Sequence, residues 1–356
     1  MFFTVQQVTN LRITNSKALP KPIELCNEIL RSSEQNLVVQ QARNDIHGII
    51  HQKDKRLLAV VGPCSIHDLD ACREYAERFA RLKNELNDRL LLVMRVYFEK
   101  PRTTVGWKGL IMDPLLNGSC DIPEGLRIAR SFLGEVLDFG IPTATELLDP
   151  ITPQYLADSL CWAAIGARTT ESQTHRQMAS GLSMPVGFKN ATSGDLKAAV
   201  NGIIAATQPQ TFLGITEDGQ ASAVTTGGNP DCQLILRGGA DGPNYSAENV
   251  QLGKIALDTV KAPASIMVDC SHANSGKDAT KQTLVLDAVM NQVADGTDCI
   301  HAVMIESHLH AGTQPFPRPV EQLDYGVSIT DGCIGWDETE ACLRKAAEII
   351  DKTRFS

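Results

Sequence analysis

Apolar runs recur along most of the chain and alternate with amphipathic segments of helical period. Each run is nearly continuous, as expected of parallel strands that are buried on both faces. The eight runs are 57–65, 90–98, 141–148, 162–168, 185–190, 233–239, 265–272 and 299–308. Helix-period segments such as 71–86, 124–140 and 194–207 lie between them. Eight such units in one chain predict a closed (β/α)8 TIM barrel rather than an open doubly wound sheet.

Two segments depart from this alternation. Residues 1–55 form an N-terminal extension, in which 4–13 alternates like an edge strand and 22–52 has a helical pattern. We expect the extension to serve subunit contacts or regulation, because it carries no cluster of reactive side chains. Two short runs within 211–227 flank a turn and predict an antiparallel hairpin inserted before the sixth barrel strand. The barrel itself is expected over 56–356.

Composition narrows the class of protein. The chain has 356 residues, 43% of them apolar, but no apolar run long enough for a transmembrane helix. Its first residues lack the basic head and apolar stretch of a signal peptide. The net charge of −9 argues against binding to nucleic acid or to an anionic membrane. Ten cysteines without a C-x-x-C pair indicate reduced thiols, so we expect a cytoplasmic globular protein.

Polar or charged residues close nearly every predicted strand. In a barrel these positions meet at the carboxyl-terminal face, where catalytic groups gather. Charged side chains directly after apolar runs would be costly to bury unpaired, so their recurrence indicates a site. The residues are Cys64, Arg95, Lys100, Glu146, Arg168, Lys189, Arg237, His272 and Glu306.

One set within this group is cationic. Six cations at one mouth would repel one another unless a multiply charged anion lay between them, and guanidinium groups suit phosphate and carboxylate. The set predicts phosphorylated substrates, with two phosphate groups and a carboxylate in all. The alternative is that each cation pairs with a carboxylate of the barrel. Its members are Arg95, Lys100, Arg102, Arg168, Lys189 and Arg237.

A second set combines soft, borderline and hard ligands and could hold a divalent transition metal. It consists of Cys64, His272, Glu306 and Asp331. Taken singly, Cys64 could be a core thiol, Glu306 an ion-pair partner and Asp331 a helix N-cap. The members are far apart in sequence, so spacing alone does not identify the set.

Several segments carry a resemblance to a known family. The chain resembles the type I 3-deoxy-D-arabino-heptulosonate 7-phosphate (DAHP) synthases, in the group regulated by aromatic amino acids. The resemblance implies a TIM barrel that condenses phosphoenolpyruvate with D-erythrose 4-phosphate and water. The products would be DAHP and phosphate, in the first step of the shikimate pathway. The matching segments are GPCSIHD (62–68), MRVYFEKPRTTVGWKGL (94–110), AIGARTTESQTHR (164–176), PVGFKN (185–190), ILRGG (235–239), PNYS (243–246), DCSHANS (269–275), IESH (305–308) and SITDGCIGW (328–336).

The resemblance also implies roles for individual residues. Cys64, His272, Glu306 and Asp331 match the family's ligands for one divalent metal ion, which could be Mn, Fe, Co or Zn. Arg95, Lys100, Arg168, Lys189 and Arg237 match the residues that hold phosphoenolpyruvate. Arg102 and Thr103, within KPRTT, match the cradle for the phosphate of erythrose 4-phosphate. We also expect Glu146 to bind substrate, and Lys100, His272 and Cys64 to be catalytic.

Regulation is expected at the hairpin and the extension, because the effector of similar proteins binds there. Gly214, in FLGIT, stands where phenylalanine-sensitive members resemble FLSVT. The smaller residue would leave room for a hydroxyl group, which favours tyrosine as the effector. The candidate effector residues are Leu147, Ser183, Phe212 and Gly214, and a homodimer or homotetramer is expected. One departure, KNATSG (189–194) in place of KNGTDG, predicts a local loop change only.

Three other functions fit parts of the pattern. A Schiff-base sugar-phosphate aldolase on the same barrel would use Lys189 or Lys100 as its amine. A non-catalytic sensor of sugar phosphates would keep the anion pocket and would not need a metal. A related sugar-acid synthase would condense phosphoenolpyruvate with a different aldose, although KPRTT favours the four-carbon sugar.

Overall fold

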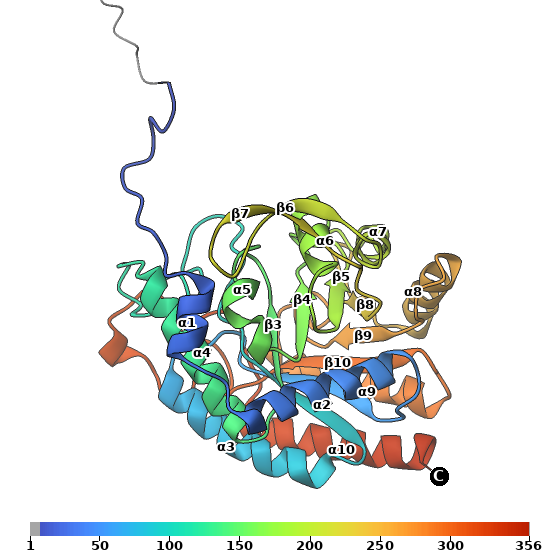
Figure 1. Ribbon diagram of the computed structural model, residues 1–356. Coiled ribbons are helices and arrows are strands. Elements are labelled where there is room, and N and C mark those ends of the chain that lie inside the picture. Colours follow the sequence, from blue (N-terminus) through green and yellow to red (C-terminus); the bar gives the residue numbers. More distant parts are fainter. Residues whose placement is uncertain (1–7, 356) are drawn as a thin grey trace, which may run out of the picture.

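A closed parallel barrel forms the centre of the molecule. The computed structural model describes residues 8–355 (Figure 1). The barrel strands follow the order β1-β10-β9-β8-β5-β4-β3-β2 around the sheet, and β2 pairs with β1 to close it. This confirms the predicted (β/α)8 fold. The strands are β1 (Leu57–Gly62), β2 (Leu90–Arg95), β3 (Thr143–Glu146), β4 (Trp162–Ile165), β5 (Val186–Lys189), β8 (Cys232–Leu236), β9 (Ile266–Asp269) and β10 (Ile300–Glu306).

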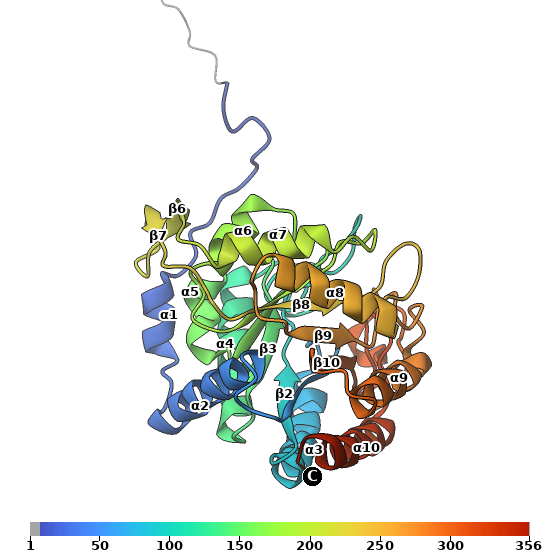
Figure 2. The same ribbon diagram turned by 90° about the vertical axis from the view of Figure 1, so that its right-hand side faces the viewer.

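Helices surround the barrel (Figure 2). Several begin at a side-chain cap, as in α3, where the carboxylate of Asp68 accepts a hydrogen bond from the backbone N–H of Ala71 at 3.0 Å. The helices are α1 (Pro22–Glu28), α2 (Ser33–Ile50), α3 (Leu69–Leu86), α4 (Ile122–Asp138), α5 (Pro153–Leu156), α6 (Gln173–Ala179), α7 (Lys197–Ala206), α8 (Ala247–Thr259), α9 (Gln282–Ala294) and α10 (Trp336–Arg354).

Alternate residues of each strand belong to two different cores. In β1, Leu57 and Ala59 pack in the layer between strands and helices, whereas Leu58 and Val60 pack in a second cluster. In β2, Leu91 and Val93 join that second cluster. Successive side chains of a strand point to opposite faces, so the second cluster is the barrel interior.

Helix α2 closes the amino-terminal mouth of the barrel. Its buried residues Val39, Ala42, Ile46, Ile49 and Ile50 pack in the same cluster as the interior side chains of the strands. The barrel interior is therefore continuous with the apolar face of α2.

The N-terminal extension follows the sequence prediction in its helices and differs from it in the edge strand. Residues 22–52 form two helices, because Ser32 starts α2 with a capping box in which its hydroxyl and the Gln35 side chain each bond the other's backbone N–H. This S-x-x-Q signal is visible in the sequence. The predicted edge strand at 4–13 is absent from its described part, 8–13, where exposed residues have no partner strand; residues 4–7 lie outside the described part of the chain.

The hairpin consists of β6 (Thr211–Ile215) and β7 (Ala221–Thr225), which pair antiparallel. Its turn contacts the extension, where the backbone N–H of Ile23 donates to the carbonyl of Glu217 at 2.9 Å. Residues before α1 extend away from the body of the molecule (Figure 1). Among the described helices, none has the length and apolar character needed to cross a membrane. All ten cysteines are free thiols.

Candidate active site

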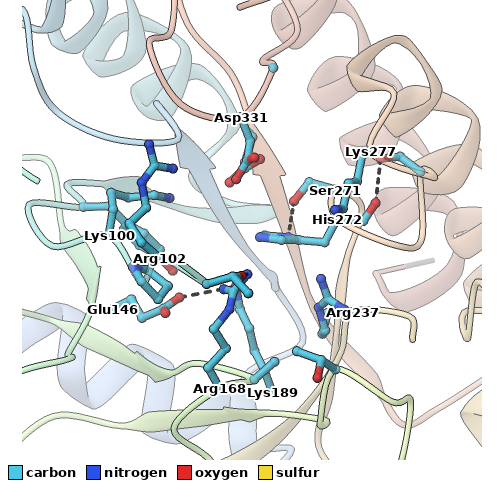
Figure 3. A pocket seen from close by; sticks show the side chains of 18 of the residues that line it. Lys100, Arg102, Glu146, Arg168, Lys189, Arg237, Ser271, His272, Lys277 and Asp331 are labelled. Carbon is cyan, nitrogen blue, oxygen red and sulfur yellow. Dashed lines mark hydrogen bonds and ion pairs between the residues drawn. The ribbon is translucent and has the colours of Figure 1, made fainter. Parts of the chain in front are cut away.

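A cavity of about 310 Å³ opens at the carboxyl ends of the strands. Its lining has seven lysine and arginine side chains and three carboxylates. Figure 3 shows these side chains converging from opposite sides of the mouth. The cationic members are Arg95, Lys100, Arg102, Arg168, Lys189, Arg237 and Lys277. All six predicted cations thus face one space, together with Lys277, which sequence reasoning missed.

The alternation of the strands explains why these residues point inward. Arg95 follows the interior residues Leu91 and Val93 at the same two-residue period. Glu306 follows Met304, and Arg237 follows Ile235, in the same way. The topmost interior layer is therefore charged, whereas the layers below it are apolar.

Three of the four predicted metal ligands come together. The Sγ of Cys64 and carboxylate oxygens of Glu306 and Asp331 lie within 4.8 Å of one another. Burial, together with the Glu306 carboxylate, raises the pKa of the Cys64 thiol to about 12, against the opposing charge of Lys100. The Lys100 ammonium lies 3.1 Å from the Cys64 sulfur. The donor set fits a transition metal, since the cluster joins a buried thiol and a buried carboxylate to the more exposed carboxylate of Asp331.

His272, the fourth predicted ligand, lies outside that cluster. It follows the end of β9 with a positive φ of 57°, and its ring reaches into the cavity (Figure 3). Its Nδ1 lies 2.9 Å from a carboxylate oxygen of Asp269 and 2.7 Å from the Ser271 hydroxyl. This contact holds one ring nitrogen and leaves Nε2 for other partners.

Two of the predicted cations are paired with carboxylates deep in the site. Arg95 is fully buried and donates to Glu306 at 3.1 Å. Lys189 lies 3.5 Å from Glu146 and 3.3 Å from Asp269. Burial would lower the pKa of Lys189, but the charges of Asp269 and Glu146 outweigh it and raise the pKa. These two cations are therefore paired with carboxylates, although both also line the cavity.

The remaining predicted cations have no such partner. Within residues 8–355, Lys100, Arg102, Arg168 and Arg237 form no ion pair within 4.0 Å. Arg168 donates to the hydroxyl of Thr103 at 3.1 Å, which joins two predicted substrate residues at the rim. These unpaired cations give the mouth a positive charge that an anionic ligand would neutralise.

Sequence reasoning missed Asp269 and Tyr97. Asp269 is fully buried, and although burial opposes its charge, His272 and Lys189 hold its pKa well below the usual range. Tyr97 lies under Arg95, whose guanidinium carbon is 3.8 Å from the centre of the ring. Both residues continue the inward alternation of their strands, Asp269 after Met267 and Tyr97 after Arg95. This two-residue period is visible in the sequence and could have identified them as residues of the site.

The four candidate effector residues come from three parts of the chain. Leu147 is fully buried in the layer between strands and helices. Ser183 faces a cavity beside α2. Phe212 and Gly214 lie on β6, where a side chain added at Gly214 would meet Val224 at 2.9 Å.

Fold and site together define a (β/α)8 barrel with an anion-binding mouth beside a group of possible metal ligands. The sequence matches the DAHP synthetase I family over residues 29–344, and the chain belongs to that family.

Similar proteins carry one common description. The chain is 51% identical to the Tyr-sensitive phospho-2-dehydro-3-deoxyheptonate aldolase of Escherichia coli over 95% of both chains. It is 52% identical to the Phe-sensitive enzyme of that organism, covering 98% of this chain and 99% of the relative. The structure of phospho-2-dehydro-3-deoxyheptonate aldolase from Francisella tularensis superposes with a TM-score of 0.94 at 45% identity, covering 96% and 99% of the two chains.

Proposed function

We propose that this protein is a DAHP synthase. It joins C3 of phosphoenolpyruvate to the aldehyde carbon of D-erythrose 4-phosphate, adds water at C2 and releases inorganic phosphate. The observation that carries the proposal is the convergence of six predicted cations and the Cys64–Glu306–Asp331 cluster on one cavity. Family membership supports the same reaction.

The depth of the cations separates two anion sites. Arg95 and Lys189 lie deep in the mouth and, with Arg168, Arg237 and Lys100, hold phosphoenolpyruvate. Arg102 and Thr103 are exposed on the rim, where they bind the phosphate of the second substrate. Holding two mutually repelling anions side by side is the main contribution of these residues to the rate.

A divalent metal ion fits the second group of residues. Cys64, Glu306 and Asp331 would hold it, and Nε2 of His272 is the further ligand that faces the cavity. A histidine ligand commonly donates its other N–H to a carboxylate, and Asp269 occupies that position here. The ion would act as a Lewis acid on the aldehyde and orient the reactants. Mn, Fe, Co and Zn all suit this mixed donor set.

Proton transfer falls to the side chains that reach the reacting atoms. As carbon attacks the aldehyde, negative charge develops on its oxygen. Burial would lower the pKa of Lys100, but the neighbouring Cys64 and Glu306 outweigh it and raise the pKa. Lys100 therefore remains an ammonium that can donate a proton there. His272, whose Nδ1 is held by Asp269 and whose Nε2 would bind the metal, has no ring nitrogen free for proton transfer while the ion is bound.

The lysine environments argue against a Schiff-base aldolase. An amine nucleophile needs a lowered pKa to be neutral at working pH. Lys189 and Lys100 are both held in the charged form by neighbouring groups, as described above. Borohydride in the presence of substrate should therefore leave the protein unmodified.

One assay tests the proposal directly. Metal-loaded protein is mixed with phosphoenolpyruvate and erythrose 4-phosphate, and released phosphate is measured with and without a chelator. We expect release that stops when the metal is removed and returns when it is restored. No phosphate release from the metal-loaded protein would overturn the proposal, and release that is insensitive to chelator would overturn the metal's part in it.

We propose further that an aromatic amino acid, by preference tyrosine, inhibits the enzyme at the hairpin and the extension. The contact of Ile23 with Glu217 joins these two segments, and relatives sensitive to Tyr and to Phe are about equally similar to this chain. Inhibition by Tyr, Phe and Trp should be measured separately. Inhibition by phenylalanine alone would contradict the choice of tyrosine. If tyrosine inhibits the wild type, a Gly214→Ser variant should shift the inhibitor preference towards phenylalanine.

Residues 1–55 are proposed to contribute to a homodimer or homotetramer. Val8, Leu11 and Ile13 are 80%, 70% and 61% exposed on the segment that leaves the body of the molecule. Leu213, on the hairpin, is 92% exposed. Light scattering after chromatography should show an oligomer for the full chain and a smaller species when Leu11 and Ile13 are changed to Asp. A monomeric full chain would refute the proposal.

A further inference from the structure

A second cluster of possible metal ligands lies at the opposite end of the barrel from the active site. His47 lies in the last turn of α2, His51 is the C-cap residue that follows this helix, and Asp231 directly precedes β8. Nδ1 of His47 and Nε2 of His51 lie 2.8 Å and 2.9 Å from the same carboxylate oxygen of Asp231. The mechanism above uses none of these residues.

We propose that His47, His51 and Asp231 form a structural site for a divalent transition metal, zinc by preference. Two histidines four residues apart on a helix present their rings on one face, which is a recurrent zinc-binding arrangement; here the last turn and the C-cap of α2 supply such a pair. Their ring centroids are 4.4 Å apart. The carboxylate supplies the third protein ligand and a negative charge that offsets the charge of the ion.

The present spacing is close to the spacing that coordination requires. A zinc ion bound about 2.0–2.1 Å from each ligand in tetrahedral geometry separates the ligand atoms by about 3.3 Å. Side-chain rotations that move each nitrogen ~0.5 Å from the Asp231 oxygen would open this space. The backbone of Asp231 is fixed, since its N–H donates to Asn229 at 3.0 Å and its carbonyl accepts from Val186 at 2.8 Å.

The surroundings leave room for a fourth ligand. The three side chains are partly exposed, and His47 and Asp231 border a cavity of about 570 Å³ that also has Asn36, Gln40 and Asn44 in its wall. Water from this cavity can complete a tetrahedral shell. Arg43, one turn before His47, directs its guanidinium to the carbonyls of Ala157 and Leu160.

Position gives the site its role. It joins α2, which closes the amino-terminal mouth, to the segment that enters β8. A bound ion would therefore fasten the extension to the barrel without touching the reacting substrates. The alternative to a metal site is that hydrogen bonds alone join the three side chains, with each imidazole donating an N–H to Asp231.

Metal stoichiometry distinguishes these two cases. Protein stripped of metal is dialysed against zinc, and bound zinc per chain is measured by plasma mass spectrometry. Changing His51→Gln should remove one equivalent in the wild-type background and again in a Cys64→Ala background, where binding at the active site is impaired. His310→Gln, at an exposed histidine outside both clusters, is the matched control and should lose none. Unchanged stoichiometry on His51→Gln would overturn the proposal.

Two further readouts identify the ligands and the structural role. Cobalt(II) bound to the Cys64→Ala variant should show visible absorption of a tetrahedral nitrogen–oxygen site without thiolate charge transfer, and His51→Gln should abolish that absorption. Zinc should raise the melting temperature of Cys64→Ala by several degrees, but not that of Cys64→Ala/His51→Gln. Equal melting temperatures of the metal-free variants would show that His51→Gln folds normally. If zinc stabilises both variants equally, His51 is not a ligand.

Discussion

The two mouths of the barrel are built by the same strands and differ in almost every property. At the carboxyl end, the inward positions are charged and surround a cavity. At the amino end, the inward positions are apolar and packed against α2. Every second residue of a strand faces inward along its whole length. In β2 these inward residues are Leu91 and Val93 near the amino end and Arg95 at the carboxyl end. The difference shows that function and stability are separated along the strand axis.

The sharpest test of this separation is a change at the charged mouth. Lys100→Ala should lower kcat by about 10²–10⁴-fold, because it removes the proposed proton donor. The melting temperature should change little in comparison. Lys108→Ala, an exposed lysine of the same loop, is the matched control and should retain kcat within about twofold, since its side chain lies outside the cavity. Steady-state phosphate release measures both variants, and equal losses would place the effect in the loop rather than in Lys100.

The converse change is made at the apolar mouth. Ile46→Ala on α2 should reduce the free energy of unfolding by about 2–5 kcal/mol, because it leaves a cavity under a fully buried side chain. We expect kcat at low temperature to be nearly normal. Leu37→Ala on the same helix changes a residue that is 63% exposed and should cost far less. Denaturant titration measures the free energy of unfolding of each variant. Similar losses for the two variants would argue against the packing of α2 in the amino-terminal mouth.

Glu99 links the pH dependence of stability to the charged end. Its buried carboxylate accepts hydrogen bonds from the backbone N–H of Asp149 and the hydroxyl of Thr152. Burial nevertheless raises its pKa from 4.5 to about 8. The unfolded chain releases this proton near pH 4.5 and the folded chain near pH 8, so the contribution of Glu99 to stability falls as the pH rises between these values.

Glu99→Gln should remove that fall. At pH 5 the variant should be close to the wild type in stability. At pH 8.5 its stability relative to the wild type should have risen by ~3–5 kcal/mol. Thermal unfolding across this range measures the difference, and parallel pH profiles for the two proteins would show that Glu99 is ionised throughout.

The smallest effect is expected at the rim. Arg102→Ala should raise KM for erythrose 4-phosphate by about tenfold to a hundredfold, which corresponds to one lost charge-assisted hydrogen bond. The KM for phosphoenolpyruvate should be nearly unchanged, because deeper residues bind it. A matching rise in both KM values would show that the two anion sites are not separate.

Much of this arrangement could be predicted from the sequence because it depends on local pattern. Apolar runs located the strands, and residues at their ends located the charged mouth. The prediction was weaker where partners from distant elements decide the outcome. Asp269 was not predicted because its role depends largely on Lys189 of β5, which only the closed barrel brings to within 3.3 Å of it. The His47–His51–Asp231 cluster likewise joins residues 184 positions apart.

The closed amino-terminal mouth also affects the order in which substrates bind and products leave. With α2 in place, the barrel resembles a cup with one opening, so both substrates enter and both products leave by the same route. In the proposed arrangement, phosphoenolpyruvate binds near the buried Arg95 and Lys189 and the sugar phosphate binds near the exposed Arg102, so phosphoenolpyruvate would have to arrive first. Steady-state kinetics should accordingly be sequential and ordered. Excess erythrose 4-phosphate should inhibit the enzyme by binding before phosphoenolpyruvate has entered.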